Sequence, residues 1–206
     1  MIKISSIILA GGRATRMGGA DKGLVQLQNK PLIQHVIQRL RPQVDEIIIN
    51  ANREISQYQA LDYPVIEDEI SGFLGPLAGI FLGLKYAKHE FVLSVPCDSP
   101  LLPLDLTARL MAGLIENEAN IAVASSNGDT HPVFCLCKKN LLKSLELYLN
   151  NGGRKVSVWQ KEQNYIEVDF SDCVDESGND AFINLNTSED INVLELDLKP
   201  AVKQFI

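Results

Sequence analysis

The sequence reads Leu9-Ala10-Gly11-Gly12-Arg13-Ala14-Thr15-Arg16-Met17-Gly18-Gly19-Ala20-Asp21-Lys22 directly after a short apolar run. Glycines let main-chain N–H groups approach an anion closely, because they carry no Cβ atom. Arg13, Arg16 and Lys22 supply positive charge beside them, and the acid Asp21 interrupts the set. The stretch therefore predicts a loop that binds a triphosphate, with a plain surface turn as the alternative.

The spacing excludes two familiar phosphate-binding motifs. A P-loop requires Gly-Lys followed by Ser or Thr, and no glycine here is followed in that way. The dinucleotide fingerprint Gly-x-Gly-x-x-Gly is absent as well. The order Leu-Ala-Gly-Gly, Arg-Met-Gly and Lys is instead typical of nucleotidyltransferases, which join a nucleoside monophosphate to a phosphorylated acceptor.

The composition indicates one globular domain. The chain has 206 residues, of which 46% are hydrophobic and 22% charged, and its formal net charge is -7. An acidic chain without a broad basic face is not expected to bind nucleic acid. No apolar run approaches the length of a membrane span or a signal-peptide core, so we expect a cytoplasmic protein that contacts no membrane.

The cysteines are not arranged for metal binding or disulfides. Cys97, Cys135, Cys137 and Cys173 form no Cys-x-x-Cys pair, and no histidine lies at zinc-finger spacing. We therefore expect Cys135 and Cys137 to pack on one buried face of a strand.

Short β-rich runs alternate with helical patterns along the chain. Strands are expected at Ile2–Leu9, Glu46–Asn50, Pro64–Ile66, Phe91–Pro96, Asn120–Ser125, Val133–Cys137 and Tyr165–Phe170. Helices are expected over Leu32–Leu40 behind Pro31, and at Pro76–Ala87, Pro103–Asn117 and Asn140–Asn150.

These elements predict an α/β fold. Ile47-Ile48-Ile49 is apolar on both faces, as in a parallel sheet that helices cover on each side. We expect a single-domain, mostly parallel twisted sheet with helices on both faces, Rossmann-like in arrangement, over residues 1–206. Residues from about 1–125 are expected to bind the nucleotide and about 126–206 the acceptor, with a mobile loop at Asp172–Asp180.

Polar residues follow three of the predicted strands, as Asn50-Ala51-Asn52, Glu67-Asp68 and Cys97-Asp98-Ser99-Pro100. In an open α/β sheet, ligands bind beyond the carboxyl ends of the strands, so these groups are expected to join the glycine-rich loop. Asn50 suits hydrogen bonding to a base or sugar, and Asp68 suits ribose, base or metal. Turn formation is the alternative for all of them.

Asp98 is the candidate metal ligand. A carboxylate at a strand end beside polyphosphate usually holds Mg²⁺, while water and phosphate oxygens complete the octahedron. Helix capping is the alternative for Asp98. Gly75-Pro76-Leu77-Ala78-Gly79 opens a predicted helix, so its N-terminal amides are expected to face the nucleotide unless the segment only initiates the helix.

The ordered set of motifs resembles the molybdenum cofactor guanylyltransferase family over nearly the whole chain. Besides the glycine-rich loop it includes Asn50-Ala51-Asn52-Arg53, Gly75-Pro76-Leu77-Ala78-Gly79, Pro96-Cys97-Asp98-Ser99-Pro100, His131-Pro132 and Phe182-Ile183-Asn184-Leu185-Asn186-Thr187. The resemblance implies transfer of GMP from GTP to the terminal phosphate of Mo-molybdopterin. It also implies release of pyrophosphate and a requirement for Mg²⁺.

The resemblance and the arguments above give a set of candidate residues. Those expected to bind the nucleotide are Leu9, Ala10, Gly11, Gly12, Lys22, Asn50, Asp68, Gly75, Gly79 and Asp98. The resemblance places Asn184 and Asn186 at the pterin. Ser99 and Ser188 depart from relatives, which often carry Thr and Pro at these positions.

The implied chemistry needs no protein nucleophile, since the acceptor phosphate attacks the α-phosphorus in line while pyrophosphate departs. Catalysis then depends on positioning and charge neutralisation, for which Arg16, Lys22 and Asp98 are the candidates. The alternatives are a cytidylyltransferase acting on the same pterin and a non-catalytic nucleotide-binding module. Cofactor-assembly proteins and molybdoenzyme chaperones are the candidate protein partners.

Overall fold

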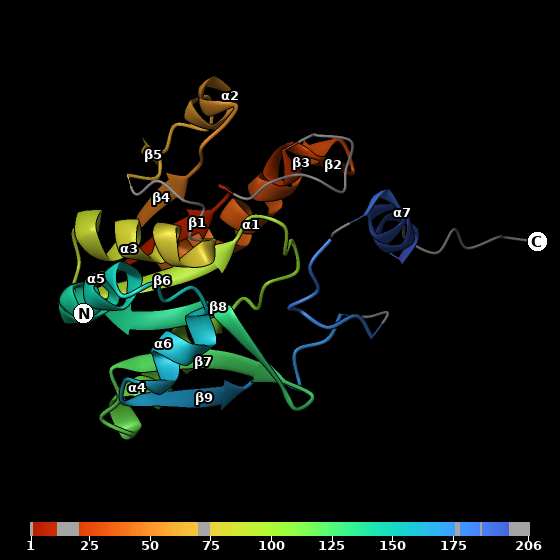
Figure 1. Ribbon diagram of the computed structural model, residues 1–206. Helices are drawn as coiled ribbons and strands as arrows, with labels where there is room; N and C mark the ends of the chain where they lie inside the picture. The colour runs from red at the N-terminus through yellow and green to blue at the C-terminus, as the bar shows by residue number, and fades with distance from the viewer. Residues whose placement is uncertain (1, 12–20, 70–74, 176–177, 186, 198–206) are drawn as a thin grey trace, which may run out of the picture.

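The computed structural model describes residues 2–11, 21–69, 75–175, 178–185 and 187–197. Within them, seven strands form one sheet in the order β5-β4-β1-β6-β8-β7-β9 (Figure 1). These strands are β1 (Ile4–Leu9), β4 (Glu46–Asn50), β5 (Val65–Ile66), β6 (Phe91–Pro96), β7 (Ile121–Ser126), β8 (Asp129–Lys138) and β9 (Tyr165–Asp169). A separate pair joins β2 (Gln26–Leu27) to β3 (Lys30–Pro31).

The sheet is mostly parallel, as predicted. β1 pairs in parallel with both β4 and β6, β4 with β5, and β7 with β9. Among the described strands of this sheet, β8 alone runs antiparallel to its neighbours β6 and β7. It does so because β7 and β8 form a hairpin across Asn127 and Gly128, whose φ angles of 52° and 87° suit a tight two-residue turn.

Helices cover both faces of the sheet (Figure 1). One hydrophobic cluster contains α1 (Leu32–Leu40), α2 (Ile55–Gln59) and α4 (Leu106–Glu116), and the other contains α3 (Pro76–Tyr86), α5 (Leu142–Asn150) and α6 (Val156–Lys161). Along β1, Ile8 belongs to the first cluster and Ile7 to the second, because successive side chains of a strand point to opposite faces. The predicted α/β fold class is therefore confirmed.

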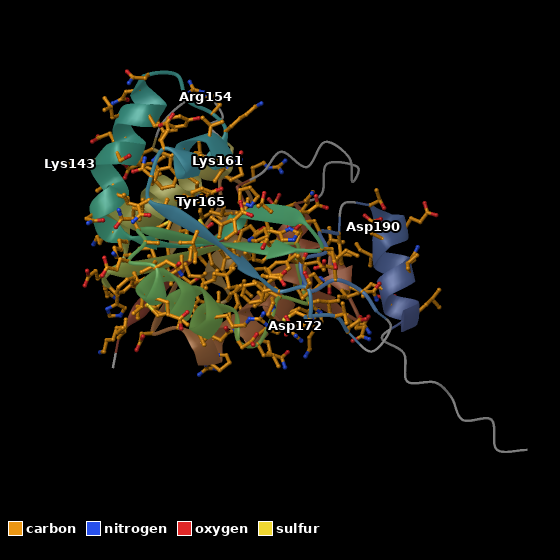
Figure 2. All side chains as sticks on the ribbon, turned by 90° about the horizontal axis from the view of Figure 1, so that it is seen from below. Lys143, Arg154, Lys161, Tyr165, Asp172 and Asp190 are labelled. Atoms are coloured by element: carbon orange, nitrogen blue, oxygen red, sulfur yellow. The ribbon has the colours of Figure 1, made fainter. Side chains whose placement is uncertain are left out.

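The helix α7 (Ser188–Asp197) lies outside these layers. Figure 1 shows it beside the β2–β3 pair, and its Ile191 and Leu194 pack with Leu27 and Leu32. In Figure 2, Asp190 marks α7 at the end of the molecule away from α5. The described structure also has three single-turn 3₁₀ helices: η1 (Lys22–Leu24), η2 (Arg41–Gln43) and η3 (Lys139–Leu141).

The predicted elements form with some shifted ends. β4 and β6 match their predicted bounds, whereas the helix expected from Pro103 begins at Leu106. The strand expected at Val133–Cys137 is the second half of the longer β8. The prediction does not include α2, α6 and α7. Helices as short as α2 and α6 show too little of the helical period to be recognised. In α7 the apolar residues do not mark one face, since Val193 and Leu196 are exposed.

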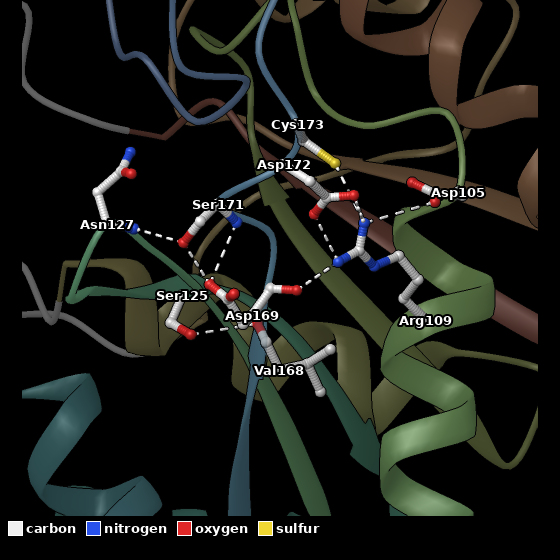
Figure 3. Close-up of polar contacts among 9 residues, drawn as sticks. All are labelled: Asp105, Arg109, Ser125, Asn127, Val168, Asp169, Ser171, Asp172 and Cys173. Atoms are coloured by element: carbon white, nitrogen blue, oxygen red, sulfur yellow. Dashed lines mark hydrogen bonds and ion pairs between the residues drawn. The ribbon is translucent and has the colours of Figure 1, made fainter.

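The first residues of Asp172–Asp180, the segment expected as a mobile loop, make several side-chain contacts (Figure 3). Arg109 of α4 donates from Nη1 to Oδ2 of Asp172 at 3.0 Å and from Nη2 to Oδ1 at 2.8 Å. Nη2 also donates to the main-chain oxygen of Asp169. Val174 and Asp180 form a β-bridge farther along. The described part of this segment is thus bonded to α4 and to itself.

The cysteines and the helices can be compared with what the composition predicts. All four cysteines are free, and Cys135 and Cys137 are buried on one face of β8 with sulfur atoms 3.7 Å apart. The packing role expected for this pair is confirmed. Across the described residues, no helix combines the length and apolar character needed to cross a bilayer.

We expect Ile7→Ala to lower the free energy of unfolding by about 2–5 kcal/mol, because it removes buried surface and leaves a cavity. Ile7 is 0% exposed within the sheet, whereas Ile2, just before β1, is 49% exposed. Ile2→Ala is the matched control and should change stability by less than about 0.5 kcal/mol. Urea unfolding followed by circular dichroism measures both. Equal effects would contradict the placement of β1.

Candidate active site

A cavity of about 400 Å³ opens at the carboxyl ends of β1, β4 and β6. Its wall includes the predicted site residues Leu9, Ala10, Gly11, Lys22, Asn50, Asp68, Gly75 and Asp98, together with Asp21, Pro76, Pro96, Cys97 and Val133. Gly79 and Asn184 lie outside this described wall. Gly12, Arg16 and Asn186 fall outside the described residues. The fold thus gathers most of the described candidates at one edge of the sheet.

A cation and a carboxylate face each other at this cavity. Lys22 Nζ lies 3.1 Å from Asp98 Oδ2, and the two side chains are 29% and 12% exposed. Lys22 begins η1, while Asp98 follows β6 in a segment that stays paired with β1, since Cys97 N donates to Leu9 O at 3.1 Å. The pair therefore places opposite charges where a polyphosphate and its cation are expected to bind.

Asp68 is oriented by two asparagines at the end of β4. Its Oδ1 accepts a hydrogen bond from Asn50 Nδ2 at 2.9 Å, and its Oδ2 accepts one from Asn52 Nδ2 at 2.8 Å. Asn52 Oδ1 in turn accepts from the main-chain N–H of Asp68 at 2.8 Å. Asp68 thus presents a carboxylate of fixed orientation to the cavity.

The amide of Asn50 is already engaged within the protein. Its Nδ2 donates to Ile66 O at 3.2 Å as well as to Asp68. Its Oδ1 lies against α3, since a Cβ atom added to Gly79 would come within 2.6 Å of it. Asn50 therefore acts on the site by orienting Asp68, and its expected contact with a base or sugar stays a prediction.

Glycines bring α3 close to the cavity. A Cβ atom on Gly79 would lie 2.3 Å from Leu9 Cδ2, so the helix can approach β1 only without a side chain there. Gly79 thus stands behind the wall, next to Leu9. Gly75 precedes α3 with φ 61° and ψ -147°, a conformation essentially restricted to glycine. Because Gly75 and Pro76 line the cavity, the N-terminus of α3 faces it, as suits an anion.

Asp21 also lines the cavity, although sequence reasoning gives it no role. Its Oδ1 accepts hydrogen bonds from the Tyr58 hydroxyl and from Gly23 N at 3.3 Å, and Arg53 Nη2 lies 3.7 Å from its Oδ2. Burial raises the pKa of the Asp21 carboxyl above its ordinary value, although the hydrogen bond from Tyr58 lowers it. Tyr58 is 37 residues away in sequence, and no local pattern signals the contact.

The expected acceptor residue Asn184 is bonded to the loop that carries Asp98. Leu185 N donates to the main-chain oxygen of Asp98 at 3.0 Å. Ser99 Oγ donates to Asn184 Oδ1 at 2.6 Å. The candidate metal ligand and the expected acceptor segment are therefore fixed relative to each other.

His131 contacts the same segment through the ring of Phe182 and, by way of Ser126, through Asp180. Ser126 Oγ donates to Asp180 Oδ2 at 2.6 Å, so the hydrogen between Ser126 Oγ and His131 Nε2, 2.7 Å apart, belongs to the histidine. The His131 ring stacks on Phe182 with centroids 4.5 Å apart. Burial lowers the pKa of His131, which favours a neutral ring. The His131 ring thus packs against Phe182, two residues before Asn184.

The donor set fits a metal ion that arrives with a polyphosphate. In the described part of the chain, no three His, Cys, Asp or Glu side chains are grouped to hold a metal. Asp98 supplies one carboxylate at the cavity. Mg²⁺ commonly takes one or two carboxylates and completes its shell with water and substrate phosphates. A single carboxylate at this place is therefore compatible with the expected Mg²⁺.

A family model and curated relatives identify one family. Residues 6–164 match the model of the MobA-like NTP transferase domain. The chain is 46% identical over 196 residues to a molybdenum cofactor guanylyltransferase of Shewanella putrefaciens, covering 95% of this chain and 98% of that protein. A protein of the same name from Polynucleobacter asymbioticus is 48% identical over 199 residues, with 95% and 97% covered.

A solved structure shares the fold. The molybdopterin-guanine dinucleotide biosynthesis protein A of Archaeoglobus fulgidus superimposes with a TM-score of 0.76 at 21% identity, covering 94% of this chain and 97% of that one. This likeness confirms the arrangement of sheet and helices.

We expect Asn52→Ala to lower the free energy of unfolding by about 1–3 kcal/mol, because it removes partners from both the carboxylate and the N–H of Asp68. Asn117→Ala is the control, since it removes an exposed side-chain bond, from Asn117 Nδ2 to Gly113 O at the end of α4, and keeps the main-chain bonds. It should change stability by less than about 0.5 kcal/mol. Urea unfolding measures both. A small effect at both positions would show that Asn52 does not hold Asp68.

Proposed function

Because the chain belongs to the MobA-like NTP transferase family, we propose that it is a molybdenum cofactor guanylyltransferase. The proposed reaction transfers GMP from GTP to the terminal phosphate of Mo-molybdopterin. Its products are the molybdopterin guanine dinucleotide cofactor and pyrophosphate. The proposal is supported by relatives of that name at 46% and 48% identity, which the chain matches over nearly their full length.

The observation that carries the proposal is the pair of Lys22 and Asp98 at the strand-end cavity. A nucleotidyl transfer needs positive charge for the departing pyrophosphate and a carboxylate for the cation that accompanies GTP. Lys22 supplies the positive charge and Asp98 the carboxylate, and Lys22 Nζ lies 3.1 Å from Asp98 Oδ2. Asp68 and the main chain of Leu9–Gly11 occupy other parts of the same wall, where a nucleoside would be bound.

The chemical step is an in-line displacement. An oxygen of the acceptor phosphate forms a bond to the α-phosphorus of GTP, while the bond to the β-phosphate oxygen breaks and the electron pair leaves with pyrophosphate. The protein aligns the two substrates and neutralises charge. We propose that Lys22 contacts the departing phosphates and that Arg16, outside the described residues, assists it.

Asp98 is the proposed holder of Mg²⁺. When bound, the cation reduces the repulsion between the two phosphorylated substrates. Asp98 contributes one carboxylate and stays close to Lys22, so both charges of the protein act on the same phosphates. The loop of Asp98 is also bonded to Leu185, which supports the proposal that the acceptor binds next to the nucleotide.

The other candidate residues are divided between the nucleotide and the acceptor. The residues proposed to bind GTP are Leu9, Ala10, Gly11, Gly12, Lys22, Asn50, Asp68, Gly75, Gly79 and Asp98. Asn184 and Asn186 are proposed to bind the pterin. Partner proteins of cofactor assembly and a cytoplasmic location stay predictions.

We expect Lys22→Ala and Asp98→Asn each to slow turnover by at least about tenfold, because loss of one preorganised charge typically costs two to three decades in rate. Pyrophosphate release with GTP, Mo-molybdopterin and Mg²⁺ measures this. Lys143→Ala on α5 (Figure 2) and Asp62→Asn, both exposed, are the matched controls and should keep wild-type turnover. Circular dichroism should show that all four variants keep the fold.

Other outcomes of this assay would change the assignment. Wild-type turnover in Asp98→Asn would remove its role at the metal. Preference for CTP over GTP in competition would indicate a cytidylyltransferase. Pyrophosphate release with none of the four triphosphates would leave a non-catalytic binding module.

We expect removal of divalent cations with EDTA to abolish turnover and added Mg²⁺ to restore it. Asp98→Asn removes the charge of the proposed ligand. The variant should therefore need a Mg²⁺ concentration about several-fold higher than the wild type to reach half of its maximal rate. Titration of Mg²⁺ at saturating GTP measures this value. An unchanged half-saturation point would place the metal elsewhere.

A further inference from the structure

A buried carboxylate lies directly before Lys22 in the sequence. The Asp21 side chain is 4% exposed, although the residue forms part of the cavity wall. A buried carboxylate is costly to a fold unless hydrogen bonds and charges compensate for the lost water. The Asp21 side chain therefore depends on the contacts that it makes inside the protein.

The contacts of Asp21 come from two different segments. Its Oδ1 accepts from Gly23 N at 3.3 Å, which caps the single turn η1 that begins at Lys22. The same oxygen accepts from the hydroxyl of Tyr58 on α2. Burial raises the pKa of Tyr58, so the hydroxyl keeps its proton for this bond. Tyr58 is 0% exposed and cannot itself touch a ligand in the cavity.

The second oxygen of Asp21 is less well satisfied. Oδ2 accepts no hydrogen bond from the described residues, and Arg53 Nη2 lies 3.7 Å away. Oδ1, in contrast, accepts hydrogen bonds from both η1 and α2, so the side chain joins these two elements in addition to capping the turn.

The packing leaves η1 little room to move. A Cβ atom on Gly23 would lie 2.6 Å from the Tyr58 hydroxyl and 3.2 Å from Cys97 Sγ. The turn is thus pressed between Tyr58, its partner through Asp21, and Cys97, the residue before Asp98. The position of Lys22 relative to Asp98 is consequently fixed by the contacts on either side of Gly23.

We propose that Tyr58 and Asp21 are positioning residues that hold the Lys22 ammonium opposite Asp98, where it meets the phosphates of the nucleotide. Tyr58 orients Asp21, Asp21 fixes the start of η1, and η1 directs Lys22. Because α2 follows β4, the same contact connects the phosphate side of the cavity to the strand that carries Asn50. The inference rests on the proposed function in its choice of nucleotide.

A double-mutant cycle on nucleotide affinity tests the proposal. The dissociation constant of GTP with Mg²⁺ is measured by calorimetry for the wild type, Tyr58→Phe, Lys22→Ala and the double variant. Tyr58→Phe should weaken binding by about fivefold, the effect of one hydrogen bond. In the Lys22→Ala background the same change should have less than about a twofold effect, since Tyr58 then has no ammonium to position.

Tyr165→Phe is the matched control. Tyr165 on the edge strand β9 (Figure 2) also donates its hydroxyl to a carboxylate, Glu167 Oε1 at 2.9 Å, but lies outside the cavity wall. It should leave GTP affinity unchanged in both backgrounds. Equal losses from Tyr58→Phe with and without Lys22, or no loss at all, would overturn the proposal in favour of a purely structural contact.

Two substitutions of Asp21 distinguish an effect on the position of Lys22 from an effect on the stability of the fold. Asp21→Asn keeps an oxygen for Tyr58 and Gly23, so GTP affinity should stay within about twofold of the wild type, while Asp21→Ala should match the loss in Tyr58→Phe. Because burial raises the pKa of Asp21, the fold disfavours its charged form, and Asp21→Asn should not lower the melting temperature. A loss of affinity in Asp21→Asn equal to that in Asp21→Ala would contradict a positioning role.

The affinity measurements also separate this proposal from the proposed function. If the wild type releases no pyrophosphate but the cycle for GTP is non-additive, the proposed reaction fails and the positioning role stands. If the wild type releases pyrophosphate but the effects of Tyr58→Phe and Lys22→Ala on GTP affinity are additive, the proposed reaction stands and the positioning role fails. A wild type that binds none of the four triphosphates would overturn both.

Discussion

The parallel pairing of β1 with both β4 and β6 is the constraint on which the site depends. In this register Leu9 lies opposite Asn50 on one side and Pro96 on the other. Gly11, Asn52 and Asp98 each follow two residues later, so three segments leave the sheet at the same level. A slip of one residue would turn every side chain of a strand to the opposite face, and the two hydrophobic clusters oppose such a slip.

Asp98 bonds to two segments that are distant in sequence, η1 and the segment of Asn184 and Leu185. Its carboxylate faces Lys22, its main-chain oxygen accepts from Leu185, and the next residue, Ser99, donates to Asn184. Transfer between two bound substrates requires that their reacting atoms be held in line. In the proposed reaction, the short loop of Asp98, bonded to both segments, would hold the two substrates in this alignment.

Local patterns in the sequence predict the sheet, most of its helices and the gathering of Asn50, Asp68 and Asp98, because parallel strands end at one edge. The reversal of β8 also has a local signal, since Asn127-Gly128 is typical of two-residue hairpins, although the prediction does not use it. Contacts between distant residues have no such signal. Tyr58 meets Asp21 across 37 residues and Ser99 meets Asn184 across 85, and only the folded packing brings them together.

The two ends of the cavity meet different demands. Asp68 is held by neutral amides, which makes that end rigid and leaves few groups to distinguish one base from another. Under the proposed function, the other end would attract a polyanion to a chain of net charge -7, and Lys22 is the one cation on the described wall. A single cation is effective only where it is correctly placed. The hydrogen bonds of Asp21 to Gly23 and Tyr58 lie next to this cation, where the proposed positioning has its largest effect.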